Sequence, residues 1–133
     1  MSSSQERFIR IATDQEKEDA LQSFFATARA SRAAAQKAAA ELERHIPTLV
    51  KAILTYSGQS EKVVRILRSC WNDWHKSGLC EDLCGLDHAI GEAVLALLAA
   101  RIHMGGDADD LIKRILVESG EMKRLERECE AAA

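Results

Sequence analysis

Apolar residues recur at intervals of three and four along nearly the whole chain, and a single proline, Pro47, interrupts them. This spacing places apolar side chains on one face of an α-helix, whereas a half-buried strand needs strict alternation. No stretch alternates valine, threonine and aromatic residues between turn residues, as strands do. The sequence therefore predicts an all-α fold.

We expect one helical domain over residues 13–133, preceded by a flexible segment at residues 1–12. The 133 residues are close to the usual size of one domain. Hydrophobic residues make up 47% of the chain, which is enough to build a core and unlike a disordered sequence. The expected architecture is a bundle of about five helices with a long alanine-rich N-terminal helix.

The first helix is expected to begin after Thr13, because Thr13 and Glu16 have the spacing of a capping box. Its apolar face is narrow and consists mostly of alanine. Pro47 lacks an amide proton, so we expect the helix to break there and a short second helix to follow. Gly58 would end that second helix in a left-handed conformation.

Three further helices follow in the predicted order. Ser60 is expected to cap the third helix, and Asp87 the fourth. The fourth helix contains the apolar run Ala93–Ala100, which is too short to cross a bilayer and predicts a buried central helix with no membrane contact. Asp107 would open a fifth helix that continues past Gly120, a residue that weakens its middle.

The chain is expected to be cytoplasmic. Its N-terminus shows no export signal, because the apolar patch Phe8–Ile11 is short and contains an arginine. In an unexported chain with enough apolar residues for a core, cysteines are expected to stay reduced. The four cysteines are Cys70, Cys80, Cys84 and Cys129.

Charge is distributed unevenly along the sequence. The net charge is -3, so the chain lacks the overall basic excess of a typical nucleic-acid-binding protein. Residues 29–76 nevertheless contain nine basic and four acidic residues, a local net charge of +5, and the remainder carries -8. Because two short helices are expected to meet at Gly58, a nucleic-acid-associated regulator with a helix-turn-helix-like basic face is an alternative reading.

Five basic residues of the basic stretch are the candidate partner-binding residues. They are expected to lie on the long first helix and on the third helix, outside the apolar stripe of each. Replacement of Arg65 and Arg68 by alanine is expected to weaken binding and to leave thermal stability nearly unchanged. On the apolar face of the third helix, Trp71 and Trp74 are expected in the core, with an interface role as the alternative. The candidate residues are Arg29, Arg32, Lys62, Arg65 and Arg68.

One cluster of cysteine and histidine residues has the side chains that zinc prefers. Its spacing lacks the paired two-to-four-residue knuckles of structural zinc sites, so small buried cysteines and partly exposed histidines are the favoured interpretation. A zinc-stabilised helical domain stays as an alternative, and no other cofactor is expected. A cysteine–histidine catalytic pair is available, but no glycine-rich oxyanion or phosphate loop accompanies it, so no enzyme is expected. The possible ligands are Cys70, His75, Cys80, Cys84 and His88.

The stretch Ser57–Asn72 contains a Gly-Gln-Ser turn followed by a valine, a leucine and a Trp-Asn pair, and the Leu-Asp step Leu86–Asp87 and the apolar helix Ile90–Leu98 come next. In these motifs, over about residues 50–100, the chain resembles an uncharacterised bacterial family of small domains of unknown function. Members of that family are often encoded on prophages, plasmids and integrative elements. The resemblance implies a mobile-element origin and no known activity.

These observations together favour a small non-enzymatic protein-interaction module. A specific version, given a mobile-element origin, is an inhibitor that docks on a host defence complex, as anti-CRISPR proteins do. A protein is the expected partner, nucleic acid is a disfavoured one, and a homodimer could form through the first or the last helix.

Overall fold

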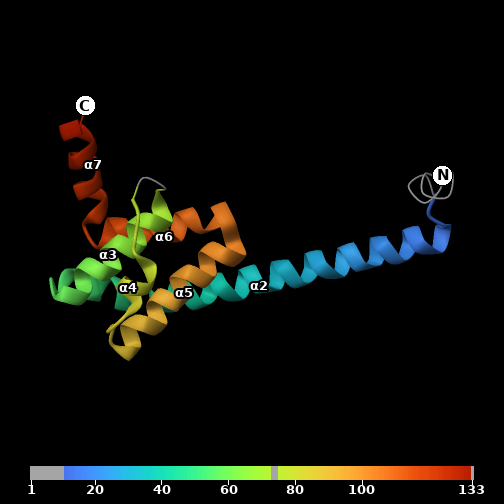
Figure 1. Ribbon diagram of the computed structural model, residues 1–133, viewed down its shortest axis with the longest axis horizontal. Helices are drawn as coiled ribbons and strands as arrows, with labels where there is room; N and C mark the ends of the chain where they lie inside the picture. Colours follow the sequence, from blue (N-terminus) through green and yellow to red (C-terminus); the bar gives the residue numbers. More distant parts are fainter. Residues whose placement is uncertain (1–10, 73–74, 133) are drawn as a thin grey trace, which may run out of the picture. The chain divides into compact units, whose positions relative to one another are not determined.

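The computed structural model describes residues 11–72 and 75–132, and the chain divides into two compact units, residues 1–33 and 34–133. Every regular element of the described residues is helical, which confirms the all-α prediction (Figure 1). Trp74 and nearly all of the segment 1–12 lie outside the described residues. The elements are α2 (Asp14–Leu54), α3 (Gly58–Trp71), α4 (Leu79–Leu83), α5 (His88–Met104), the 3-10 turn η1 (Gly105–Ala108), α6 (Asp109–Glu118) and α7 (Glu121–Ala132).

The first turns of α2, up to residue 33, make up the described helical part of the first unit. The predicted capping box is confirmed: Glu16 N donates to Thr13 Oγ1 and Thr13 N donates to Glu16 Oε2, both at 3.2 Å. None of residues 11–33 is buried. Phe24 and Phe25 are 66% and 49% exposed, and their ring centroids lie 5.8 Å apart in an edge-to-face arrangement.

The predicted break at Pro47 is wrong, because α2 continues through this residue to Leu54. A proline inside a helix removes one backbone hydrogen bond and crowds the preceding turn. Here Pro47 is exposed, while Ile46 and Leu49 on either side of it are fully buried in the core of the second unit. Burial of these side chains on one continuous helix face therefore outweighs the local penalty of the proline.

The turn between α2 and α3 also differs from the prediction. Tyr56, not Gly58, has the left-handed backbone conformation, with φ of 52°, and Gly58 already begins α3. The N-cap of α3 is Ser57 rather than Ser60. Ser60 lies at the third helical position, where its hydroxyl accepts a hydrogen bond from Ser57 N at 2.8 Å. The sequence thus predicted the N-cap of the correct helix, but three residues after its actual position.

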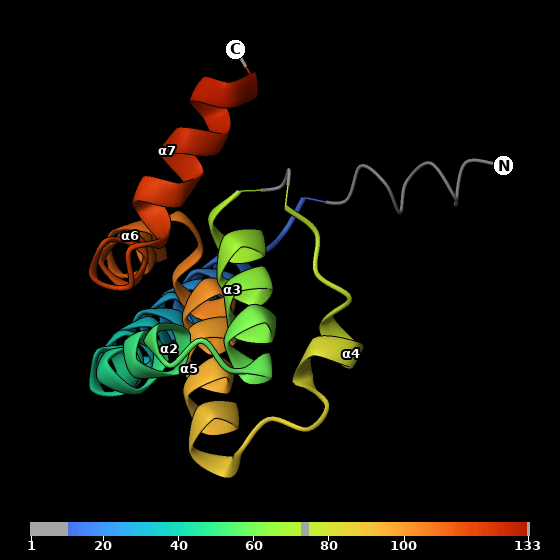
Figure 2. The same ribbon diagram turned by 90° about the vertical axis from the view of Figure 1, so that its left-hand side faces the viewer.

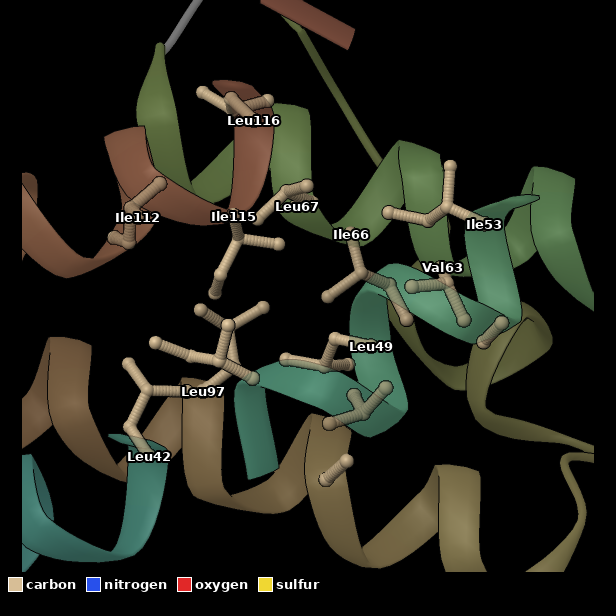
Figure 3. Close-up of a cluster of buried hydrophobic side chains, with 14 of the residues drawn as sticks. Leu42, Leu49, Ile53, Val63, Ile66, Leu67, Leu97, Ile112, Ile115 and Leu116 are labelled. Carbon is tan, nitrogen blue, oxygen red and sulfur yellow. The ribbon is translucent and has the colours of Figure 1, made fainter. Parts of the chain in front are cut away.

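The core of the second unit is formed by α3, α5, α6 and the part of α2 that follows Ala38. Figure 2 shows α3 alongside α5, and α3 also contacts α6. The largest fully buried apolar side chains in this core are leucine and isoleucine, and Figure 3 labels all of them except Ile46, converging from these helices. They are Leu42, Ile46, Leu49, Ile66, Leu67, Leu97, Ile112, Ile115 and Leu116.

The expected central helix is α5, and Asp87 is its N-cap residue, although its side chain makes no capping hydrogen bond. Val94 and Leu97 are fully buried, but Leu95 and Ile102 are 54% and 75% exposed, so α5 is not buried all round. By length and composition alone, the stretch His88–Glu118 could cross a membrane, which is weak evidence because a core helix passes the same test.

Two loop predictions are corrected by the structure. Between α3 and α5, where no helix was predicted, the chain forms the one-and-a-half-turn helix α4. The expected single last helix is two helices, because Gly120 has φ of 82° and separates α6 from α7. Glycine adopts this left-handed conformation without steric penalty. Gly120 therefore ends α6 instead of only lowering the stability of one longer helix.

Candidate functional site

The hydroxyl of Ser60 fixes the start of α3. Besides accepting from Ser57 N, Ser60 Oγ donates to the carbonyl oxygen of Ala52 at 2.5 Å, which connects α3 to the last turns of α2. From this start, α3 places Lys62, Arg65 and Arg68 at three-residue intervals, so that they are neighbours along the helix surface. The structure therefore brings three of the five predicted binding residues together.

Arg65 forms a forked ion pair with Asp82 of α4. Its Nη2 and Nε donate to Asp82 Oδ1 at 2.7 and 3.0 Å, and Ser77 Oγ donates to Asp82 Oδ2 at 2.5 Å. The Asp82 side chain is only 6% exposed. Hydrogen bonds from Arg65 and then from Ser77 hold the pKa of the Asp82 carboxyl below its usual range, and Asp82 in turn raises the pKa of Arg65.

Arg68 is largely enclosed and binds two glutamates of α7. Its Nη2 lies 3.0 Å from Glu121 Oε2, and its Nη1 lies 3.0 Å from Glu128 Oε2. The side chains of Arg68 and Glu121 are 14% and 1% exposed. Arg124 Nη1 approaches the second oxygen of Glu121 at 3.2 Å, so the buried carboxylate lies between two guanidinium groups. This pairing joins α3 to α7 and argues against the expectation that Arg68 can be removed without loss of stability.

Lys62 also has a partner within the second unit, a backbone carbonyl group. Its Nζ donates to the carbonyl oxygen of Cys84 at 2.5 Å, next to Gly85, which has φ of 75°. All three basic residues of α3 therefore have partners inside the second unit. Carboxylates balance the charges of Arg65 and Arg68, and Lys62 donates to a neutral carbonyl group, which leaves a weaker basic face than the sequence suggested.

Next to these arginines lies an open cleft of about 390 Å³, which we call the Tyr56 cleft. Tyr56 is 70% exposed, and the guanidinium carbon of Arg124 lies 5.7 Å from its ring centroid, within the range of a cation–π contact. Arg65 and Arg124 are about half exposed. The residues lining the cleft are Ile53, Tyr56, Ser57, Ser60, Glu61, Val64, Arg65, Arg68, Glu121 and Arg124.

Two larger hollows in the second unit lack this combination of tyrosine and arginine. One, of about 450 Å³, is lined by four alanines and by His45 and His103 among others. In it, His45 Nε2 lies 3.9 Å from Glu41 Oε2. The other, of about 530 Å³, is lined by Thr48, Gln59 and Ile90 among others, and Gln59 Oε1 accepts from Asp87 N at 2.7 Å.

Arg29 and Arg32 belong to the first unit, where both side chains are exposed on α2. Within residues 11–72 and 75–132 neither of them makes an ion pair. They therefore belong to a different unit from Lys62, Arg65 and Arg68.

The five possible zinc ligands are not gathered into a site. Among the described residues, no group of three or more histidine, cysteine, aspartate or glutamate side chains is arranged to hold a metal ion. Cys80, Cys84 and His88 are exposed, while Cys70 and His75 are half-buried. Burial raises the pKa of the Cys70 thiol, which disfavours the reactive thiolate.

Sequence reasoning missed Tyr56, Arg124 and the partners of the α3 arginines. Arg68 and Glu121 are 53 positions apart, and no local pattern predicts such a pair. The one available indication was the charge distribution, because a basic stretch of +5 beside an acidic remainder of -8 can be neutralised within one fold. For Tyr56 the only signal was a weak one, its position in the turn just before the capping serines.

Comparison with known proteins places this site within a shared domain. No curated protein and no solved structure matches the chain significantly. The model of a family described as a family of unknown function (DUF7673) matches residues 43–129, which include the whole Tyr56 cleft and exclude the described part of the first unit. Because the match spans 87 of the 133 residues, the chain belongs to this family of unknown function, DUF7673.

Proposed function

We propose that this chain is a non-enzymatic protein-interaction module that receives its partner at the Tyr56 cleft. The observation that carries the proposal is the conformation of Tyr56, a bulky side chain that is 70% exposed on a left-handed backbone. Left-handed backbone costs an L-residue about 1–2 kcal/mol, and only glycine adopts it freely.

Tyr56 recovers little of this penalty within the protein. Its ring is mostly in solvent, and the contact with Arg124 is a half-exposed cation–π pair of about 0.5–1 kcal/mol. Strained residues of this kind concentrate at binding and catalytic sites. Because Ser57 and Ser60 next to it are used for capping, binding is better supported than catalysis at this cleft.

The side chains of the cleft indicate the chemistry of the partner. Tyrosine and arginine are the residue types most enriched at energetic centres of protein interfaces. Arg65 and Arg124 each keep donor N–H groups beyond those used on Asp82 and Glu121. We infer a partner protein that places an apolar side chain against Tyr56 and a hydrogen-bond acceptor, such as a carbonyl oxygen, between the two arginines.

The alternatives receive less support. A nucleic-acid-associated regulator would need free cations, and Lys62, Arg65 and Arg68 are bound within the fold. A zinc-stabilised domain would need its ligands brought together. A more specific form of our proposal is a cytoplasmic inhibitor of a host defence complex, which rests on the mobile-element origin that the family resemblance implies.

The test compares the tagged full chain with its Tyr56→Gly variant in capture from a nuclease-treated bacterial lysate, followed by binding of the purified partner. Glycine relieves the backbone strain, so the variant is expected to be at least as stable as the wild type. We expect its affinity to fall about tenfold or more, as at an interface hot spot. The control Ile102→Ala, which removes a 75% exposed apolar side chain elsewhere, should bind normally. Unchanged affinity of Tyr56→Gly, or capture that disappears with nuclease, would overturn the proposal.

A further inference from the structure

The first unit presents an apolar helix face with no partner in its own described residues. Leu21, Phe24, Phe25 and Ala28 have the spacing of one helix face, which we call the Phe24 face. Leu21 is 55% exposed, and the two phenylalanines are 66% and 49% exposed. A helix gains most of its stability by packing such a face, so an uncovered one indicates an interaction surface.

The helix is acidic before the Phe24 face and basic after it. Residues 14–19 contain four acids and one lysine, and Arg29 and Arg32 follow the phenylalanines. Phe24 is five positions after Asp19, and Phe25 is four positions before Arg29. The aromatic pair therefore lies midway between the acidic and the basic end. Asp14, Glu18, Arg29 and Arg32 make no ion pair within the described part of the chain.

The charge pattern of one helix is complementary to that of a second copy running in the opposite direction. If two copies of the helix run antiparallel, a two-fold axis near the phenylalanines places the acidic turns of each copy beside the arginines of the other. A parallel pair would instead place like charges together. We propose that the partner of the Phe24 face is a second copy of this chain, in an antiparallel homodimer of the α2 turns up to residue 33.

The available area sets the strength of this dimer. At about 200 Å² per phenylalanine, the exposed fractions of Phe24 and Phe25 amount to roughly 230 Å² per chain. The 20 residues from 14 to 33 extend about 30 Å, along which alanines and the stems of charged side chains add further area. The sum approaches the low end of specific interfaces, so a reversible dimer with Kd on the order of 10 μM is expected.

The apolar part is tested by sedimentation velocity of the full chain, with thiols kept reduced, from about 1 to about 200 μM. The wild type should change from the 14.7 kDa monomer to the dimer across this range. Phe24→Ala/Phe25→Ala should stay monomeric throughout. The control Leu95→Ala/Ile102→Ala removes comparably exposed apolar side chains from the second unit and should dimerise as the wild type does.

Charge reversal tests the antiparallel arrangement. Glu18→Lys/Asp19→Lys makes both ends basic, and Arg29→Glu/Arg32→Glu makes both ends acidic, so each variant should dimerise about tenfold or more weakly. In the variant with all four substitutions the two ends have opposite signs again, in exchanged order, so it should regain much of the wild-type affinity. A parallel pair would show no such loss and recovery.

A monomeric wild type at the highest concentration would overturn the proposal, and so would dimerisation that is insensitive to Phe24→Ala/Phe25→Ala. Failure of the four-fold variant to recover would overturn the antiparallel arrangement. None of these three results bears on the Tyr56 cleft, whose residues all belong to the second unit.

Discussion

Replacement of Arg68 by methionine tests the ion pairs that join α3 to α7. Methionine keeps most of the apolar stem of the side chain and removes the guanidinium group with its charge. The substitution leaves Glu121, which is 1% exposed, with Arg124 as its remaining cation at 3.2 Å. Glu128, which is 55% exposed, returns to solvent.

The expected loss follows from the burial of the two partners. Breaking a buried ion pair on one side costs about 3–5 kcal/mol, because the other charge stays uncompensated. Arg124 compensates part of the charge of Glu121, so we expect a value near the lower end, about 3 kcal/mol. For a domain of this size that corresponds to a decrease in melting temperature of roughly 10 °C.

Urea denaturation followed by circular dichroism measures this loss at neutral pH. Arg114→Met is the matched control, because Arg114 makes only half-exposed pairs with Glu43 and Glu118 and should change stability by less than about 0.5 kcal/mol. The double variant Arg68→Met/Glu121→Met should recover much of the loss, since a buried pair can be exchanged for apolar side chains. If Arg68→Met is no more destabilising than Arg114→Met, the buried ion pair does not stabilise the fold as we argue.

Two further predictions concern stability. Because hydrogen bonds from Arg65 and Ser77 lower the folded-state pKa of Asp82, they stabilise the fold above the usual carboxyl pKa and are lost as pH falls through the lowered value. Asp82→Asn should therefore be less stable than the wild type at pH 7, and urea titrations should show the difference shrinking as pH falls through the lowered pKa; a difference that does not change with pH would contradict this. Pro47→Ala should increase the free energy of unfolding by about 1–3 kcal/mol, because Pro47 is an exposed residue inside α2, and a decrease would show that the proline fits the helix without penalty.

The sequence predicted those parts of the fold that depend on local patterns. Helical periodicity indicated the all-α class, and the Thr13 capping box and the Asp87 N-cap position were found at the expected residues. It failed where packing outweighed local preference, as at Pro47, where core burial on both sides keeps α2 continuous. It also failed at Tyr56, since no local rule favours a tyrosine over the nearby Gly58 in a left-handed turn.

The candidate site was predictable only in part. The basic composition of α3 was evident, but Asp82 and Glu121 are 17 and 53 positions from the arginines they bind. Pairs of this separation are fixed by the tertiary arrangement of the helices. Sequence alone therefore gave the cations without showing that the protein itself already binds them.

The way α7 is attached has a consequence for its local opening. Only Glu121 and Leu125 of this helix are buried, so the ion pairs with Arg68 are an important part of what holds it to α3. Helices with little apolar burial open at lower free energy than the global unfolding of a protein. Amide hydrogens of α7 should thus exchange earlier than those of α3 and α5, and the difference should widen as added salt weakens the exposed pair with Glu128.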